Sequence, residues 1–350
     1  MTFSVFPSAD RGDLLRHVGS VEQLCAATRV TFADGPARGM EAVEVRTGSG
    51  LAFQVLPDRG MGIGEATMFG LPLAWISAHG PVAPWFYNPE GVGWLQSFGG
   101  GLLTSCGLTN VGAPCSVDGI DVGLHGRLAH TPARDVAITR GWQGDHYGIE
   151  ISGTTLDYAV LGPALETRRS IAVSMGDNRI RIRDTVVNIG ARPQPIFMLY
   201  HFNFGYPLVS ESARLSIEPS APIRARDPAY SEEVAVWQCL TPPRAGYEER
   251  VLFHDFSACG AVTARVRVEN AVGDGLLAME MEFPPATLDH LVEWKMMGER
   301  EYVLGLEPGN CFASGREDSF ARNDVDFLEA GATKTFDVSL AFSWTPSWGA

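Results

Sequence analysis

Apolar and polar residues alternate along many short segments of this chain. In the clearest of them, five apolar side chains alternate with Asp, Ser and Ala: Phe336, Val338, Leu340, Phe342 and Trp344. Because successive side chains of a β-strand point to opposite faces of a sheet, this pattern predicts a half-buried antiparallel strand. The same reasoning predicts strands at 42–47, 52–56, 135–139, 167–173, 179–188, 262–268 and 276–283. Short strands separated by Gly, Pro, Asn and Asp are typical of an all-β sandwich.

Helical periodicity is scarce. Residues 10–18 and 319–328 are compatible with two short helices, and no regular succession of strands and helices indicates a parallel sheet. The segment Gly60-Met61-Gly62-Ile63-Gly64 resembles a dinucleotide-binding loop, but its third glycine comes one position early and no long helix follows. We therefore expect a turn between strands at 60–64, and no nicotinamide cofactor.

The composition favours a single domain over residues 1–350. With 45% hydrophobic residues in 350, the chain can bury a large core. Two Gly- and Pro-rich stretches, 80–101 and 219–243, keep large apolar side chains such as Trp85 and Trp237, which interdomain linkers seldom carry. We interpret both stretches as long surface loops of one large antiparallel β-sandwich.

The net charge limits the classes of binding partner, and the cysteines indicate the redox compartment. Lys and Arg number 27 against 41 Asp and Glu, and the resulting net charge of −14 disfavours binding to nucleic acids or to anionic membrane surfaces. Six scattered cysteines without a C-x-x-C pair predict reduced thiols. The start lacks the features of a signal peptide, and no apolar run has membrane-spanning length. We expect a cytoplasmic protein. A homodimer is a common default for soluble enzymes, but nothing in the sequence points to it specifically.

His201 is the first candidate for proton transfer. It follows the apolar run 195–200 and is flanked by aromatic residues, so partial desolvation is expected to bring its pKa near neutrality, as suits a general acid. A hydrogen-bonded core histidine is the alternative. The nearby Asn203 favours the functional interpretation, because it adds a hydrogen-bonding side chain that could contact a substrate.

Glu307 is the second candidate. It follows the apolar run 302–306 and precedes Pro308-Gly309, which we expect to form a turn at the end of the strand. A carboxylate in such a place is costly to bury unless it is hydrogen-bonded or functional, and burial raises its pKa into the range of a general base. The alternatives are an acid that caps the turn and an ion-pair partner of Arg316.

His125 lies in a third segment, Gly123-Leu124-His125-Gly126-Arg127. Glycine lets a ligand approach the backbone, and imidazole and guanidinium groups can orient that ligand by hydrogen bonds. A structural turn histidine is an equal alternative. A zinc site with His130 is the weaker interpretation, because a spacing of five places the two side chains on opposite sides of a strand and no third ligand is near.

Two arginines and an aromatic-rich loop could add substrate contacts. Arg59 and Arg127 lie in Gly-rich contexts and could hold a phosphate or carboxylate, although for Arg59 alone a surface ion pair is the favoured role. Aromatic residues concentrate between Trp75 and Phe98, directly before three glycines. Such rings stack on the C–H face of a sugar, and Trp75 and Trp94 are our candidates, while core packing is the commoner role of tryptophan.

Five motifs carry a family resemblance, which covers most of the chain, roughly Val21 to Trp344. They are PDRGMGIGEA, GGLLTSCGLTNVG, GLHGRLAH, MLYHFNFGYPL and EWKMMGEREYVLGLEPGN. In order and character they resemble the aldose 1-epimerase (galactose mutarotase-like) superfamily, and most closely a bacterial, aldose-epimerase-like branch. The resemblance implies a β-sandwich of the supersandwich type with few short helices. It also implies a cofactor-independent sugar mutarotase or epimerase.

The resemblance also implies individual roles. His201 in YHFNFG matches the general acid at the sugar ring oxygen, and Glu307 in GLEPGN matches the general base on the anomeric hydroxyl. His125 in LHGR matches a histidine that binds the substrate. Arg59, or in its place Arg127, matches an arginine that contacts sugar hydroxyls. Removing the O1 proton while protonating the ring oxygen opens the hemiacetal, so an acid and a base on opposite sides of the sugar suffice.

The sequence also departs from the better-studied mutarotases. Asp227 and Asp255 lie in contexts unlike that of the mid-chain aspartate those enzymes use on sugar hydroxyls, and Arg127 follows His125 more closely than the usual arginine. One alternative is therefore an epimerase, isomerase or lyase acting at another carbon of a keto, deoxy or acidic sugar. A second is a carbohydrate-binding protein without turnover. If both Arg59 and Arg127 face the pocket, an acidic or phosphorylated sugar is favoured over a neutral one.

Overall fold

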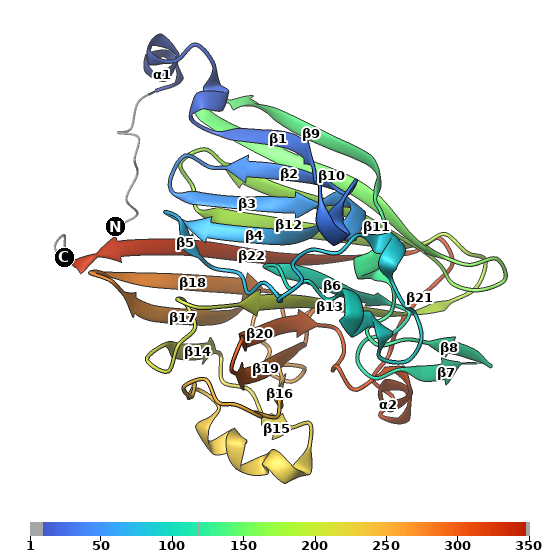
Figure 1. Ribbon diagram of the computed structural model, residues 1–350. Helices are drawn as coiled ribbons and strands as arrows, with labels where there is room; N and C mark the ends of the chain where they lie inside the picture. The colour runs from blue at the N-terminus through green and yellow to red at the C-terminus, as the bar shows by residue number, and fades with distance from the viewer. Residues whose placement is uncertain (1–9, 118, 348–350) are drawn as a thin grey trace.

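Two large antiparallel sheets form the sandwich in this computed structural model, which describes residues 10–117 and 119–347 (Figure 1). Within those residues the larger sheet has twelve strands. Ten follow the order β1-β2-β3-β4-β6-β13-β20-β19-β16-β15, while β5 pairs with β4 and β21 with β13. They are β1 (Ala26–Thr31), β2 (Glu41–Arg46), β3 (Leu51–Leu56), β4 (Gly62–Met68), β5 (Leu71–Pro72), β6 (Leu103–Leu108), β13 (Gln194–Phe204), β15 (Ile223–Ala225), β16 (Arg250–Asp255), β19 (His290–Gly298), β20 (Glu301–Gly309) and β21 (Asp326–Leu328).

The second sheet, in the same part of the chain, has eight strands in the order β14-β17-β18-β22-β12-β11-β10-β9. They are β9 (Arg134–Gln143), β10 (His146–Tyr158), β11 (Ala164–Ser174), β12 (Arg179–Asn188), β14 (Arg214–Glu218), β17 (Ala264–Val272), β18 (Gly275–Phe283) and β22 (Thr333–Pro346). A separate two-stranded ribbon joins β7 (Cys115–Val117) and β8 (Ile120–Val122).

Helices are short and lie outside the sheets. The α-helices are α1 (Arg11–His17) and α2 (Arg316–Ala321). The 3-10 segments are η1 (Val21–Gln23), η2 (Gly35–Ala37), η3 (Pro57–Arg59), η4 (Pro84–Phe86), η5 (Gly93–Ser97), η6 (Leu128–His130) and η7 (Pro228–Val236). No helix in the described part of the chain is long and apolar enough to cross a membrane.

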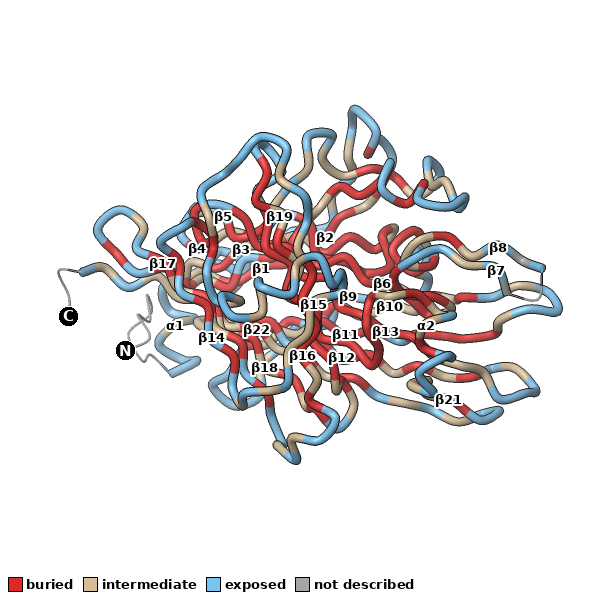
Figure 2. Tube along the Cα trace, turned by 90° about the horizontal axis from the view of Figure 1, so that it is seen from below, coloured by how far each residue is buried: buried red, intermediate tan, exposed pale blue. Residues whose placement is uncertain are grey.

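Alternate side chains of the two sheets fill the space between them. On β13, Tyr200, Phe202 and Phe204 are fully buried and belong to the same apolar cluster as Ile171 of β11 and Leu340 of β22. Figure 2 shows the buried residues running along the strands through the middle of the molecule, with the exposed ones on the connections. Burial of this apolar surface is the main force that holds the sheets together.

A buried ion pair within the second sheet is also hydrogen-bonded to the larger sheet. Arg169 of β11 donates from Nε to Asp184 of β12 at 2.7 Å, and Tyr200 of the larger sheet donates to the same carboxylate at 2.6 Å. From Nη1, Arg169 reaches the Gly60 and Met61 carbonyl oxygens at 3.3 and 3.2 Å. The ion pair is fully desolvated, so its hydrogen bonds must all be made. The hydrogen bonds from Nη1 fix the backbone of Gly60 and Met61, the two residues directly after Arg59.

The structure confirms the all-β antiparallel sandwich and the strands expected from alternation, each within a few residues of an observed strand. Of the turn expected at 60–64, only Gly60 and Met61 lie between η3 and β4, because Gly62 already begins β4. The helix expected at 10–18 corresponds to α1. The helix expected at 319–328 is wrong: α2 ends at Ala321, and 326–328 is strand β21, paired with β13. The surface loop expected at 219–243 also contains β15 and η7.

Candidate active site

The register of β13 and β20 places His201 and Glu307 on one face of the larger sheet. Phe202 pairs with Leu306, which puts His201 opposite Glu307, and opposed residues of antiparallel strands share a face. His201 Nε2 lies 3.2 Å from Glu307 Oε1, without the alignment of a hydrogen bond. Only 5% of His201 and 2% of Glu307 is exposed. The structure thus brings the two expected catalytic residues into contact.

Burial favours the uncharged form of each group. It lowers the pKa of His201 to about 3, and a positive charge on His125 acts in the same direction. The expectation of a near-neutral pKa for His201 is therefore wrong, because desolvation is nearly complete. Burial also raises the pKa of Glu307 well above its ordinary value, the Glu249 charge adds to this, and Arg226 opposes it. Burial thus favours the state in which the carboxyl holds the shared proton and the imidazole is neutral, a state without net charge.

The turn expected after Glu307 is also wrong. Pro308 and Gly309 continue β20, and Gly309 pairs with His290 of β19 and with Leu199 of β13. Glu307 therefore lies inside a central strand, between two hydrogen-bonded neighbours, and not at a strand end. This position explains its complete burial and makes it rigid.

Asn203 supports the backbone around the pair. Its Nδ2 donates to the Gly101 carbonyl oxygen at 2.9 Å and to the His201 carbonyl oxygen at 3.1 Å. Its Oδ1 is buried and has no hydrogen-bond partner among the described residues, as is also true of His201 Nδ1. The Asn203 side chain opposes the lowering of the His201 pKa. Buried polar atoms without partners are rare in folded proteins, so their concentration here indicates a site for a polar ligand.

His125 reaches the pair from the connection between β8 and η6. It has a left-handed backbone, with φ of 57°, and the Gly112 N–H donates to its Nδ1 at 3.2 Å. The neutral ring therefore carries its proton on Nε2, where it can donate to a ligand. Burial, followed by the Arg226 charge, lowers its pKa to about 4. The His125 and His201 rings meet edge to face, with centroids 5.8 Å apart.

Aromatic rings enclose the two histidines. Trp94 lies on η5 with 1% of its surface exposed, and its centroid is 4.9 Å from that of His125. Its Nε1 has no hydrogen-bond partner in the described structure. Phe98 stacks on Trp94 at 4.6 Å and packs 5.4 Å from His201. Trp75 packs against the outer ring, with its centroid 5.8 Å from that of Phe98. Trp94 is thus close to the pair, whereas Trp75 contacts it through Phe98.

The two candidate arginines lie in different environments. Arg127 is exposed and lies with Nε 3.5 Å from Asp157 Oδ1, while its Nη2 donates to the Tyr158 carbonyl oxygen. These contacts direct it toward β10, and it makes no described contact with the histidines or with Glu307. Arg59 is buried and donates to the Ser97 carbonyl oxygen at 3.0 Å. It therefore sits behind the loop that carries Trp94. The condition stated for an acidic sugar, that both arginines face the pocket, is thus not met by Arg127.

His130, the partner in the disfavoured zinc interpretation, has a structural environment. Its Nε2 lies 2.7 Å from Ser97 Oγ, and its ring stacks on Tyr87 at 4.1 Å. Burial and the charge of Arg59 lower its pKa to about 2, so the ring is neutral. Among the residues that the structure describes, no group of three or more His, Cys, Asp or Glu side chains is arranged to hold a metal ion.

Three further residues complete the surroundings, and sequence reasoning did not single them out. Trp294 of β19 packs edge to face on His201 at 5.3 Å, and its Nε1 donates to Glu249 at 2.8 Å. Glu249 in turn forms an ion pair with Arg226. The side chains of Arg226 and Glu249 are 39% and 46% exposed, so this pair connects the buried site with solvent. Trp294 belongs to a motif quoted above; the ion pair has no local sequence signal.

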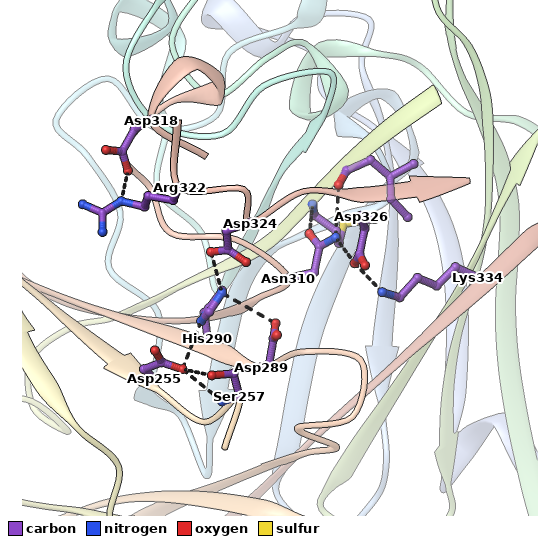
Figure 3. A network of polar contacts seen from close by, with 12 residues as sticks. Asp255, Ser257, Asp289, His290, Asn310, Asp318, Arg322, Asp324, Asp326 and Lys334 are labelled. Atoms are coloured by element: carbon purple, nitrogen blue, oxygen red, sulfur yellow. Dashed lines mark hydrogen bonds and ion pairs between the residues drawn. The ribbon is translucent and has the colours of Figure 1, made fainter. Parts of the chain in front are cut away.

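A second polar network lies on the same sheet (Figure 3). His290 of β19 lies 3.1 Å from Asp324, 3.8 Å from Asp289 and 3.9 Å from Asp255, and it stacks on Phe312 at 4.0 Å. Burial opposes its protonation, but the hydrogen bond to Asp324 and the carboxylate charges outweigh burial and raise its pKa. These contacts of His290 hold the segment after β20 on the sheet.

That segment supports the His125 loop. The Arg316 N–H, at the start of α2, donates to Asn110 Oδ1 at 2.9 Å, and Asn110 Nδ2 donates to the Gly123 carbonyl oxygen at 2.9 Å. Gly123 lies two residues before His125. The second network therefore helps to position His125 but does not join the proton-transfer pair.

Comparison with known proteins places this chain in a family. Residues 37–342 match the model of a family described as a domain of unknown function, DUF4432. The chain belongs to the DUF4432 family. A search of curated proteins finds no match.

Solved structures relate this DUF4432 chain to sugar epimerases. A candidate aldose 1-epimerase from Klebsiella pneumoniae superimposes with a TM-score of 0.84 at 26% identity, covering 94% of this chain and 87% of the other. A galactose mutarotase-like protein from Clostridium acetobutylicum gives 0.63 at 13% identity, covering 92% and 99%. Galactose 1-epimerase from Lactobacillus acidophilus gives 0.55 at 10%, covering 92% and 99%. These matches confirm the resemblance to the galactose mutarotase-like superfamily. For the last two they show the fold alone.

Proposed function

We propose that this protein is a cofactor-independent sugar mutarotase or closely related epimerase, with His201 and Glu307 as its catalytic residues. The observation that carries the proposal is the buried contact between the two side chains, 3.2 Å apart and surrounded by unpartnered polar atoms. The similarity to aldose 1-epimerases in fold supports a sugar as the substrate. We also propose a reducing, cytosolic setting, in line with six free cysteines.

The contact suits ring opening at an anomeric carbon. An acid and a base on opposite sides of the sugar were expected, but His201 and Glu307 are in contact. Because the O1 hydroxyl and the ring oxygen are bonded to the same carbon, two groups in contact can reach both from one side of the sugar. Glu307 accepts the O1 proton while His201 donates to the ring oxygen. This leaves a neutral imidazole and a protonated carboxyl, which is the form that burial favours. Rotation about the bond to the freed carbonyl and reversal of both transfers give the other anomer.

The charged starting form needs support from the substrate. A hydrogen bond from O1–H to Glu307 and the field of Arg226 both favour the carboxylate. Three further groups can then bind sugar hydroxyls. The donors are His125 Nε2–H and Trp94 Nε1–H, and the acceptor is Asn203 Oδ1. We assign Arg59 to the substrate as well, and Trp75 to the outer aromatic wall.

Anomer exchange tests this proposal. Two-dimensional NMR exchange spectroscopy on a panel of aldoses and ketoses should show enzyme-dependent interconversion for at least one sugar, with a rate that falls about 10²- to 10⁴-fold in Glu307→Gln. Glu299→Gln, an exposed change on the turn between β19 and β20, serves as the matched control. Unchanged exchange on every sugar at stoichiometric protein would reject the mutarotase.

A second function is favoured by one feature. Arg226 and Glu249 form an ion pair next to Trp294. In the sequence, no convincing counterpart was found of the mid-chain aspartate that better-studied mutarotases use on sugar hydroxyls. Different hydroxyl contacts could present another carbon to the same acid and base. NMR of the sugar after long incubation separates the two functions: a new species indicates epimerisation, isomerisation or elimination, and a changed anomer ratio indicates mutarotation.

A further inference from the structure

Arg59 is a buried cation without a carboxylate partner. Only 7% of its surface is exposed. Nη2 donates to the Ser97 carbonyl oxygen, and Nη1 has no hydrogen-bond partner among the described residues. Burial alone lowers its pKa to about 10, with no carboxylate acting in the other direction. Buried charges in proteins are normally paired, because an isolated one loses its hydration without compensation.

Arg59 lines a cavity of about 100 Å³. Much of the cavity wall is glycine backbone, from Gly62 and Gly64 of β4 and from 99–101, and the Thr104 side chain adds a hydroxyl. Apolar side chains such as Leu56 and Val82 complete the wall, and the glycines let a ligand approach the main chain closely where they line it. Glu65 also lines the cavity, but its side chain is exposed and forms no ion pair with Arg59. Glu65 therefore does not neutralise the positive charge of the buried Arg59.

One residue of the cavity wall is a direct neighbour of His201, although neither His201 nor Glu307 lines the cavity. Thr104 of β6 lies directly opposite His201 of β13, and such opposed residues have Cβ atoms about 5 Å apart. Gly101, on the same wall, accepts the hydrogen bond from Asn203. A sugar whose anomeric carbon lies over His201 and Glu307 thus has the cavity within the reach of its other substituents.

We propose that the Arg59 cavity binds an oxyanion, a carboxylate or a phosphate, carried by an acidic sugar whose ring lies at His201 and Glu307. The position of the ring rests on the function proposed above. The planar guanidinium has donors in a fork that matches either oxyanion, and Nη1 is free to donate. A neutral hydroxyl group would leave the buried cation uncompensated. The overall charge of −14 gives no general attraction for anions, so the preference is local.

Binding of matched sugars tests this site without relying on turnover. Calorimetric titration compares glucose with glucuronate and glucose 6-phosphate, and galactose with galacturonate and galactose 6-phosphate. The proteins are wild type, Arg59→Met, Arg59→Lys and, as the matched control, Arg183→Met, which alters an exposed arginine of the second sheet. We expect an acidic sugar to bind about tenfold or more tightly than its neutral parent, from charge-assisted hydrogen bonds. The advantage should disappear in Arg59→Met, persist in part in Arg59→Lys and remain whole in Arg183→Met.

The outcomes separate this site from the proposed function. Preference for the uronate or for the phosphate identifies the oxyanion. Equal binding of neutral and acidic sugars, or an acidic preference that survives Arg59→Met, overturns the oxyanion site even if anomer exchange is observed. If no sugar binds, the proposed function fails first, and thermal denaturation with acetate or inorganic phosphate then decides: Arg59-dependent stabilisation keeps the oxyanion site, and its absence overturns it. A variant that does not fold leaves the wild-type comparison of matched sugars decisive.

Discussion

Replacing Glu307 with Gln should stabilise the protein, and increasingly so as the pH rises. Glu307 is 2% exposed, and burial raises its pKa well above the ordinary value. A raised pKa means that the folded form is most stable when the carboxyl is protonated. This stability is fully present below the pKa of the unfolded chain, about 4.3, and is lost as the pH rises toward the folded pKa. Gln keeps the shape of the neutral side chain and does not titrate.

The size of the effect follows from the linkage relation. One pH unit in this window costs the wild type about 1.4 kcal/mol. An unfolding entropy of about 2.1 cal/mol/K per residue gives about 0.7 kcal/mol/K for 350 residues. The difference in Tm between Glu307→Gln and wild type should therefore grow by about 2 °C per pH unit.

Differential scanning calorimetry at several values between about pH 5 and pH 8 measures this difference, and Glu299→Gln should follow the wild type at every pH. Because His201 is common to both proteins, its own titration contributes little to the difference. Parallel curves of Tm against pH for Glu307→Gln and wild type would show that the Glu307 carboxyl ionises alike in folded and unfolded chains. The reasoning about the buried pair would then be refuted.

Four further substitutions test three other parts of the structure. Glu249→Gln removes a charge that raises the Glu307 pKa, so the alkaline limb of kcat/KM should move to lower pH. Arg226→Met removes a charge that lowers this pKa, so the limb should move to higher pH. Shifts in the same direction would contradict the assignment of that limb to Glu307. His290→Gln should lose most stability below about pH 6.5 and less as the pH rises through the raised His290 pKa, and a pH-independent loss in denaturant titrations would contradict this. Arg169→Met leaves a buried carboxylate unpaired, so the free energy of unfolding should fall by about 3–5 kcal/mol in urea titrations; a loss below about 1 kcal/mol would exclude the ion pair as a structural element.

Much of the fold was accessible from the sequence because each half-buried strand repeats with period two. The stretch 336–344 shows this, since its apolar residues are those that β22 buries against the core. The helix expected at 319–328 failed because local helical periodicity competed with pairing to β13, which the local sequence does not encode. Pairing of this kind depends on residues far apart in the chain.

The site was accessible only where a motif or an unusual local environment marked a residue. His201 and Glu307 are ionisable residues in apolar strands, and the structure brings them together. Arg127 gave no hint of Asp157, which lies on a different strand. The ion pair of Arg226 and Glu249 joins two irregular segments that meet only in the folded protein. Their positions follow from tertiary contacts, so composition and spacing could not reveal them.

The most direct test of the central claim is a crystal structure of Glu307→Gln soaked with the sugar that binds most tightly. The account predicts the anomeric carbon at His201 and residue 307, with O1 within hydrogen-bond distance of the introduced amide and the ring oxygen facing the imidazole. A sugar that presents another carbon to these two residues would contradict anomer interconversion and favour chemistry at that carbon. A sugar bound away from both residues would contradict their catalytic assignment altogether.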